Sequence, residues 1–542
     1  MIESERIALF TSRTVVRCII AAMTNPRMWF CAAVMMACGV AGAQPSPQAV
    51  RDQVRQYRQQ HEVEIVRAYA QLLSLPNVAG DAANIRANAD FISTALERRG
   101  FKTRLLSVGA GSPVVYGELL SPGAKHTILW YAHYDGQPVD KSQWARDPWS
   151  PVLRDGLTTD PAKTIPLDSL HAPLNPEWRI YARAASDDKA QIQALLTALD
   201  ALSATKLPTG VNLKVFFEGE EEAGSRHLEA IMRQNAELLK GDLWLLSDGP
   251  VHQTRRMQLY FGARGVADLE MTLYGPSRAL HDGHYGNWAP NPAALLVDLL
   301  ARMRDGDSHI LIPGYYDDVR PLSPSERQAI AQIPDVDTQL KQELGLAWTE
   351  SKGQPVAMAI TQPALNIRGL EAGHVESKAQ NAISTEAKAS LDLRLVPDQK
   401  PDKVQALVEE FIRRQGFYIV HQTPDLETRR AHAKIIKLNW GSGYPAARTS
   451  MDDPAVLPVV TAIEQTLGAP LVKMPMLGGS VPMYLFPDLL KTPVVGLPIV
   501  NHDNNQHAAN ENLRLQNLWD GIEIFAGILT GTEKNWNATA KK

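Results

Sequence analysis

Histidines and carboxylates directly follow apolar, strand-like runs in five short segments of the sequence. These segments are residues 128–135, 185–189, 215–222, 245–248 and 505–507. In an open α/β sheet the carboxyl ends of the strands face one crevice, so residues placed there in distant segments converge in space. Imidazole nitrogen and carboxylate oxygen are both good ligands for zinc. Two imidazoles and several carboxylates at such a crevice therefore indicate a site for a pair of divalent metals.

Each segment by itself also has a purely structural explanation. A solvated charged turn would explain residues 220–222, a helix N-cap would explain Asp187, and a simple turn before Gly136 would explain Asp135. The buried-strand pattern of residues 211–217 places the three acids at the mouth of a strand. That placement, together with the other four segments, favours the metal site.

The order and the local sequences of the five segments resemble those of the di-zinc metallopeptidase family that contains carnosinase-like dipeptidases, glutamate carboxypeptidases and aminoacylases. The resemblance runs from about residue 48 to about residue 530 and covers all five segments in order. It implies two zinc ions per subunit, and Mn²⁺ or Co²⁺ could occupy the same ligands. One metal would be held by His133, Asp187 and Asp248, and the other by Asp187, Glu222 and His507, with Asp187 as the bridge.

The resemblance also implies a mechanism and the roles of two further acids. Two cations roughly 3.5–4 Å apart share a carboxylate and a bridging water, which becomes acidic and attacks an amide carbonyl. Glu221 would be the general base, next to the ligand Glu222. Asp135 would fix the tautomer of the His133 imidazole and raise its basicity.

Five residues outside the metal segments match catalytic or substrate-binding positions of the family. Residues 280–283 resemble its Leu-His-Ser-Gly segment, so His281 would stabilise the oxyanion, commonly across a dimer; Asp282 replaces the usual Ser, and His284 is a nearby rival. Asn381 would bind a substrate carbonyl or carboxylate. Arg394 and the glycine-serine loop would hold a substrate carboxylate. The residues of that loop are Gly479 and Ser480.

These assignments also have structural alternatives. His281 would then be a plain surface histidine, Arg394 would form a structural salt bridge, and the glycine-serine loop would be a tight turn. The sequence departs from the family pattern near Asp187, where Ala182, Ala184 and Ala190 stand at positions at which glycines are common. Because alanine is less free at positive φ, we expect the backbone of that loop to differ.

The element pattern predicts an α/β protein. Its catalytic domain would have a mixed, mostly parallel sheet flanked by helices, with an inserted α+β, ferredoxin-like domain as lid and dimer interface. Helices are expected over residues 48–75 and up to Gly100, and strands and helices then alternate as far as Asp248. Residues 267–274 and 389–396 alternate like half-buried antiparallel strands, and helices over 292–303 and 404–412 would cover one face of their sheet. The stretch between 303 and 389 is expected to be irregular.

The predicted domain boundaries follow this change of pattern. A signal peptide would occupy residues 1–43, and the catalytic domain residues 44–262 and 441–535. The inserted domain would span residues 263–440 between these two parts. Residues 536–542 would be a tail.

The N-terminus has features of a secretory signal. Arg27 precedes an apolar run over residues 28–38, and residues 41–43 supply a small-x-small cleavage site. The sequence therefore predicts export to the periplasm or outside, with no stable membrane span after cleavage, and Cys38 as a lipid-attachment site is the weaker alternative. Residues before Met23 are unusual for a leader, so translation could start at Met1 or at Met23. All three cysteines precede Ala43, which leaves no disulfide in the mature chain.

Composition excludes several classes of protein. The chain has 542 residues, 44% hydrophobic and 21% charged, which is typical of a globular protein of two domains. Its formal net charge is −4, and the segment before Ala43 is basic, so the remainder is more acidic still. A nucleic-acid partner is therefore not expected.

Three functions remain open from the sequence. The first is zinc-dependent hydrolysis of the amide bond of dipeptides or short peptides with a free carboxylate, in a homodimer formed through the lid domain. The second is an N-acyl-amino-acid amidohydrolase, which shares every catalytic residue. The third is a non-catalytic peptide-binding relative, which the presence of Glu221 and all five ligands argues against.

Overall fold

The structure is a computed structural model, and it describes residues 45–157 and 163–539. Its contacts divide the chain into Met1–Ser46 and one compact unit, Pro47–Lys542. The signal peptide predicted over residues 1–43 lies outside the described residues. Among the described helices, none has the length and apolar character that crossing a membrane requires.

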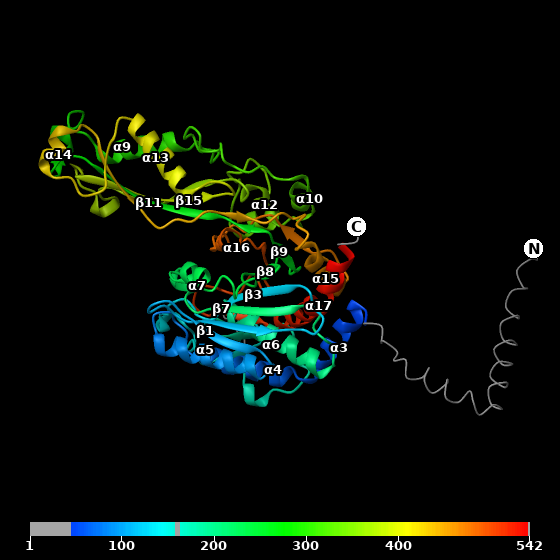
Figure 1. The fold of residues 1–542 in the computed structure, drawn as a ribbon. Coiled ribbons are helices and arrows are strands. Elements are labelled where there is room, and N and C mark those ends of the chain that lie inside the picture. Colours follow the sequence, from blue (N-terminus) through cyan, green and yellow to red (C-terminus); the bar gives the residue numbers. More distant parts are fainter. Residues whose placement is uncertain (1–44, 158–162, 540–542) are drawn as a thin grey trace, which may run out of the picture. The chain divides into compact units, whose positions relative to one another are not determined.

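A mixed sheet of eight strands forms the centre of the catalytic part (Figure 1). In order across the sheet its strands are β1 (Lys102–Leu106), β2 (Val114–Leu119), β7 (Asn212–Glu218), β3 (Thr127–His133), β8 (Leu243–Leu246), β20 (Val494–Gly496), β9 (Gln258–Tyr260) and β19 (Val472–Met474). The neighbours β7, β3, β8 and β20 are parallel, whereas β1 and β2 are antiparallel. The carboxyl ends of the four central strands therefore meet at one edge.

Helices cover both faces of this sheet, as the apolar strand sequences require. Side chains alternate along β3, so Trp130 packs into the core on one face and Tyr131 into the core on the other. The first core includes α5 (Ala82–Glu97), α6 (Lys189–Ala204) and α17 (Leu515–Thr539), and α3 (Pro47–Gln60), α4 (Glu62–Leu73) and α15 (Leu457–Leu467) pack beside them. The second core includes α7 (Leu228–Gln234) and α16 (Leu485–Leu490).

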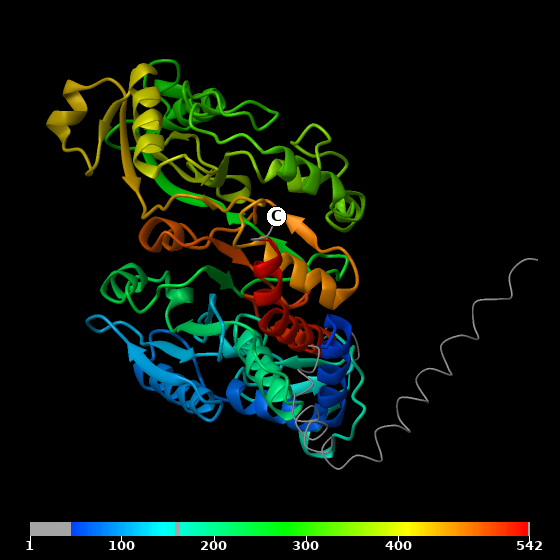
Figure 2. The same cartoon turned by 45° about the vertical axis from the view of Figure 1, so that its right-hand side comes forward.

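A second, five-stranded sheet has its own core. Its strand order is β13 (Ala364–Glu371), β15 (Glu386–Leu395), β11 (Gly265–Tyr274), β17 (Ile435–Trp440) and β16 (Tyr418–Val420). Alternate residues of β11, such as Leu269 and Met271, pack against α9 (Pro292–Met303) and α13 (Pro401–Arg414). On the other face, Asp268 and Glu270 pair with Arg368. In Figure 2 the yellow helix α13 runs beside these strands, so the alternation correctly predicted helices on one face.

Two local expectations are wrong. The helix expected over residues 48–75 is two helices, α3 and α4, which are separated at His61. The stretch expected to be irregular contains α10 (Pro324–Gln332), α11 (Asp337–Glu343), α12 (Val356–Ala359) and β13. Ser323 and Glu326 form a capping box that begins α10, which is a sequence signal that apolar periodicity does not reveal.

Short elements complete the described part of the chain. A four-stranded sheet has the order β21 (Asn512–Arg514), β6 (Arg179–Tyr181), β4 (Val152–Arg154) and β5 (Thr164–Ile165). Two-stranded pairs join β10 (Gly262–Ala263) to β18 (Ala447–Arg448) and β12 (Leu280–His281) to β14 (Ala382–Ile383). The remaining helices are α8 (Asp282–Tyr285) and α14 (Leu426–Ala431), with 3-10 turns η1 (Lys141–Gln143), η2 (Leu167–Ser169), η3 (Glu221–Ala223) and η4 (Glu376–Lys378). The domain boundaries stay a prediction, because residues 47–542 form a single unit by their contacts.

Candidate metal centre

The strand ends bring the five predicted ligands together. His133 is the last residue of β3, and Asp248 follows the neighbouring parallel strand β8 by two residues. Glu222 lies in η3, directly after β7 on the other side of β3. Asp187 ends the loop before α6, and His507 lies in the segment between β20 and β21. The convergence follows from the parallel order of the central strands.

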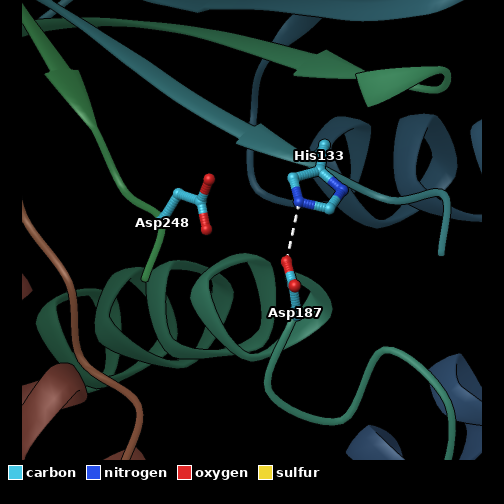
Figure 3. A group of neighbouring side chains, drawn as sticks. All are labelled: His133, Asp187 and Asp248. Atoms are coloured by element: carbon cyan, nitrogen blue, oxygen red, sulfur yellow. Dashed lines mark hydrogen bonds and ion pairs between the residues drawn. The ribbon is translucent and has the colours of Figure 1, made fainter. Parts of the chain in front are cut away.

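The first group of possible ligands is His133, Asp187 and Asp248, all of which are buried. Their candidate ligand atoms lie within 4.8 Å of one another. The Nε2 of His133 is 3.0 Å from Oδ1 of Asp187. Figure 3 shows these two side chains facing each other, with the Asp248 carboxylate directed toward the same space. This arrangement suits one cation between the three side chains.

The second group is Asp187, Glu222 and His507, and its candidate ligand atoms also lie within 4.8 Å of one another. The Nε2 of His507 is 3.1 Å from Oδ2 of Asp187 and 3.4 Å from Oε2 of Glu222. The two oxygens of Asp187 therefore face different histidines, as a bridging carboxylate would. Asp187 is the one residue that the two groups share.

The charges of this cluster fit bound cations. Burial, and then the nearby charge of Asp187, raise the pKa of Asp248 to about 6 and that of Glu222 to about 7. The hydrogen bond to Asp187 raises the pKa of His507 to about 9. Burial opposes ionisation of Asp187, but bonds to His133 and His507 hold its pKa below the usual range. Crowded carboxylates that resist ionisation mark a place where positive charge would be stabilising. Two imidazoles and three carboxylates are also the donor set that zinc accepts.

Asp135 connects the histidine ligand to the acids. Its carboxylate accepts the backbone N–H of Glu221 at 3.1 Å and that of Glu222 at 3.0 Å. The Nδ1 of His133 lies 3.3 Å from Oδ1 of Asp135. This contact supports the predicted role of Asp135 in orienting the imidazole. It also fixes the turn that carries the two glutamates.

The three consecutive acids have three different environments. Glu220 accepts hydrogen bonds from the backbone N–H groups of Ser112 and His227, and its Oε1 is 2.9 Å from Nδ1 of His227. Glu221 lines a cavity, and burial raises its pKa well above the usual range. Glu222 belongs to the second ligand group. The run is therefore not a solvated charged turn.

The metal groups open into a cavity of about 430 Å³. Asp187, Glu221 and Asp248 line it, together with Arg394, Gly479 and Ser480. The Arg394 guanidinium donates to Oγ of Ser480 at 2.7 Å and to Oδ2 of Asp392 at 2.8 Å. The predicted arginine thus forms the alternative salt bridge and also faces the cavity.

The structure does not bring the other two predicted substrate residues to this cavity. Among the described residues, those that line it do not include His281 or Asn381. These two lie together instead, because β12 pairs with β14 and the backbone carbonyl of Asn381 accepts the N–H of Asp282. The His281 side chain is 55% exposed, and its ring lies 4.6 Å from that of the rival His284.

The sequence reasoning missed several polar residues that contact the ligands. Gln506 donates to Oδ2 of Asp187 at 3.1 Å, and Gln137 donates to Oε2 of Glu222 at 2.7 Å. Glu511 accepts the backbone N–H of Asp187 at 2.9 Å. Gln506 and Gln137 lie within four residues of predicted ligands, and that closeness is the only signal that the sequence offers for them.

One of the three alanines at glycine positions has a glycine-like backbone conformation. Ala184 has a φ of 60°, in the left-handed region that favours glycine, whereas Ala182 and Ala190 do not have a positive φ. The loop keeps this conformation with alanine, and it still carries Asp187 into the cluster.

Comparison with known proteins identifies the family. Residues 129–531 match the model of Peptidase family M20/M25/M40. This match covers more than half of the chain, and the protein belongs to that family, whose members are metallopeptidases with a catalytic domain and an inserted dimerisation domain. The resemblance seen in the sequence and the expected fold are therefore confirmed.

Similar proteins are named as dipeptidases and a carboxypeptidase. Cys-Gly metallodipeptidase dug1 of Schizosaccharomyces pombe is 28% identical over 479 residues, which cover 85% of this chain and 94% of the relative. Beta-Ala-His dipeptidase of Homo sapiens is 24% identical over 513 residues, 90% of this chain and 94% of the relative. The structure of the M20 family metallo-carboxypeptidase Sso-CP2 from Sulfolobus solfataricus matches with a TM-score of 0.70 and 28% identity, and covers 87% of this chain and 99% of that one.

The predicted export is wrong. The relatives of this chain are named Cys-Gly metallodipeptidases and Beta-Ala-His dipeptidases, and this group does not support export. The features of the N-terminus are not confident evidence for a signal peptide. The prediction depended on one short apolar run next to small residues. Such a run is not distinctive by itself.

Proposed function

We propose that this protein hydrolyses the amide bond of dipeptides or short peptides that have a free carboxylate, with two zinc ions per subunit. The observation that carries the proposal is the pair of ligand groups that share Asp187 at the mouth of the central sheet. Membership of the metallopeptidase family and the dipeptidase names of the relatives support metal-dependent hydrolysis of dipeptides.

The chain's own residues supply the proton transfers. Two divalent ions held by the ligand groups would supply a Lewis acid for the substrate carbonyl and an activated water. Glu221 faces the cavity beside Asp187 and Asp248. Because its pKa is raised by burial, its carboxylate is suited to accept a proton from the attacking water and pass it to the leaving nitrogen.

Arg394 and Ser480 provide a place for the substrate carboxylate. They lie on the same cavity as Glu221, and their side chains are joined at 2.7 Å. A guanidinium presents paired N–H donors that match the two oxygens of a carboxylate. A peptide held there by its carboxylate would place its amide bond near the metal groups. Gly479 has no side chain and leaves room at this position, since a Cβ there would meet no atom within 4 Å.

A homodimer formed through the inserted domain would complete the site. His281 and Asn381 are neighbours on the β12–β14 pair, are exposed, and are outside the cavity of their own chain. This placement supports a contribution of His281 to the cavity of a second subunit, where its imidazole would stabilise the oxyanion.

Hydrolysis assays on a substrate panel test the proposal. The panel contains dipeptides, tripeptides, peptides with an amidated C-terminus and N-acyl amino acids, and each is assayed with added Zn²⁺ and with chelator. We expect chelator-sensitive cleavage of the dipeptides and weak cleavage of the amidated forms. Turnover of N-acyl amino acids alone would instead assign an amidohydrolase, and metal binding without turnover of any substrate would favour a binding protein.

A further inference from the structure

Glu511 is a completely buried carboxylate that accepts five hydrogen bonds. Its Oε1 accepts the backbone N–H of Ser186 at 2.8 Å, the hydroxyl of Ser186 at 2.9 Å and the backbone N–H of Asp187 at 2.9 Å. Its Oε2 accepts the backbone N–H of Ala184 and the guanidinium of Arg183, both at 2.9 Å. Every donor belongs to residues 183–187, the loop that ends in the shared ligand of both metal groups.

The same residue is fixed to the segment that carries the histidine of the second group. Glu511 follows His507 by four residues, and its backbone carbonyl accepts the N–H of Ala182 at 3.2 Å. Side chain and main chain of Glu511 therefore tie the 182–187 loop to the 507–511 segment. Within this arrangement the Nε2 of His507 lies 3.1 Å from Oδ2 of Asp187.

The connection also acts on a strained part of the loop. Ala184 has a φ of 60°, a conformation that is unfavourable for a residue with a Cβ. Its N–H points to Oε2 of Glu511. An alanine at this position needs a partner that holds the backbone, and the carboxylate of Glu511 is that partner. No other described carboxylate bonds to the N–H groups of Ala184, Ser186 and Asp187.

We infer that Glu511 is a positioning residue that sets the spacing of Asp187 and His507, and with it the affinity of the second metal group for its ion. The inference rests on the proposed function, because it assigns Glu511 a part in building that site. Partners that orient metal ligands typically change metal affinity by about 10–100-fold when they are replaced.

Glu511→Gln is the direct test. The glutamine has the same shape, but its NH₂ group would face N–H donors of the loop, so part of the connection becomes repulsive. Glu523→Gln is the matched control, because Glu523 is also buried and accepts hydrogen bonds from Arg51 and Arg55 at 2.8–2.9 Å. These two arginines belong to helix α3 and not to a loop that carries a metal ligand. Binding of Zn²⁺ is measured by titration of the metal-free proteins, together with Tm, kcat and KM.

We expect Glu511→Gln to weaken binding of the second Zn²⁺ by about 10–100-fold, to lower kcat more than it changes KM, and to regain part of kcat in excess Zn²⁺. The control should lower Tm without changing Zn²⁺ affinity. A Glu511→Gln protein that loses only Tm and binds both ions as the native protein does would overturn the inference.

Ser186→Ala keeps the test available if Glu511→Gln does not fold, because it removes only the hydroxyl donor to Oε1. It should weaken the second Zn²⁺ in the same direction by a smaller factor, and unchanged Zn²⁺ affinity would count against the inference. Failure of the proposed function gives a different result, in which the native protein binds no Zn²⁺ or binds it and cleaves no peptide.

Discussion

The mouth of the central sheet and the two-stranded β12–β14 region both contain predicted site residues, yet they differ in completeness. At the sheet mouth, five ligands from five segments form two groups that share Asp187, each with its ligand atoms within 4.8 Å of one another, in a single chain. In the β12–β14 region, His281 and Asn381 are neighbours that face solvent and do not line the cavity. The ligands of the first site lie together within one chain, whereas under the proposed function His281 would act on the cavity of a second subunit.

This difference has a physical origin. Parallel strands must end at the same edge of a sheet, so the positions of His133 and Asp248 follow once β3 and β8 pair. No such constraint ties the β12–β14 pair to that edge, because these two strands form a sheet of their own, separate from the central sheet. Residues of the sheet mouth should therefore act within one subunit, and His281 across two.

Replacing Glu221 by Gln is expected to give the largest loss. The variant removes the proton acceptor and keeps the shape, so kcat should fall by about 10²–10⁴-fold. Zn²⁺ binding should stay close to native, because Glu221 belongs to neither ligand group. The measurement is kcat on a cleaved dipeptide, with metal content determined in parallel and the exposed Glu229→Gln as control. A variant that keeps native kcat would remove Glu221 from the mechanism.

His281→Ala tests whether the second region acts in trans. Loss of an oxyanion donor should lower kcat by about 10²–10³-fold. Mixing this variant with Glu221→Gln should restore activity in the mixed dimer, because one of its cavities combines a native Glu221 with a native His281 from the other subunit. The control is His284→Ala, which tests the neighbouring ring. Lack of recovery on mixing, with exchange of subunits demonstrated, would contradict action across a dimer.

Some residues of the site could be predicted from the sequence and others could not. The five ligands and Glu221 could be predicted from the resemblance to the family, helped by the strand-like runs before His133, Glu222 and Asp248, and the structure brings the ligands together at the ends of the central strands and in their flanking loops. Glu511 could not, because its importance lies in bonds to backbone N–H groups, which have no sequence pattern. The absence of His281 from the cavity of its own chain agrees with the resemblance, which placed this histidine commonly across a dimer.

The fold shows a similar limit. Strong periodicity predicted α9 at the bounds observed and β11 to within two residues. Between α9 and β15, α10 begins at a capping box and not in a long apolar stripe, so periodicity alone did not reveal it. The alternating apolar face of β11 needed only local sequence, whereas helices of that stretch depend on capping and on tertiary contacts.

Arg394→Ala tests how the substrate carboxylate is bound. Arg394 comes from the second sheet yet lines the cavity at the sheet mouth. KM for a dipeptide with a free carboxylate should rise by about 10–100-fold, as expected for the loss of a charge-assisted bond. KM for an amidated substrate should change much less. Arg368→Ala is the matched control, since Arg368 pairs with Asp268 on the same sheet away from the cavity. Equal effects on both substrates would assign Arg394 to structure alone.

The smallest expected effect is the pH dependence of the metal-free protein. Burial and crowding raise the folded-state pKa of Asp248 to about 6 and of Glu222 to about 7, and the bond to Asp187 raises that of His507 to about 9. A raised folded-state pKa contributes stability below the unfolded value and loses it as pH rises through the folded value. Tm of the metal-free protein should therefore fall by a few degrees between pH 5 and pH 9, on the order expected for changes of about 1 kcal/mol.

Zn²⁺ should reverse this trend, because the ion binds the ionised carboxylates and neutral imidazoles that high pH produces. Thermal melts at several pH values, with and without Zn²⁺, measure both effects. We expect the pH dependence of Tm to come from the buried residues of the sheet mouth. His281→Ala, which changes only the exposed β12–β14 region, should therefore leave the pH profile of Tm as it is in the native chain. A profile that is flat without Zn²⁺ would mean that the crowded carboxylates do not set stability, and that the sheet mouth tolerates its charge without a cation.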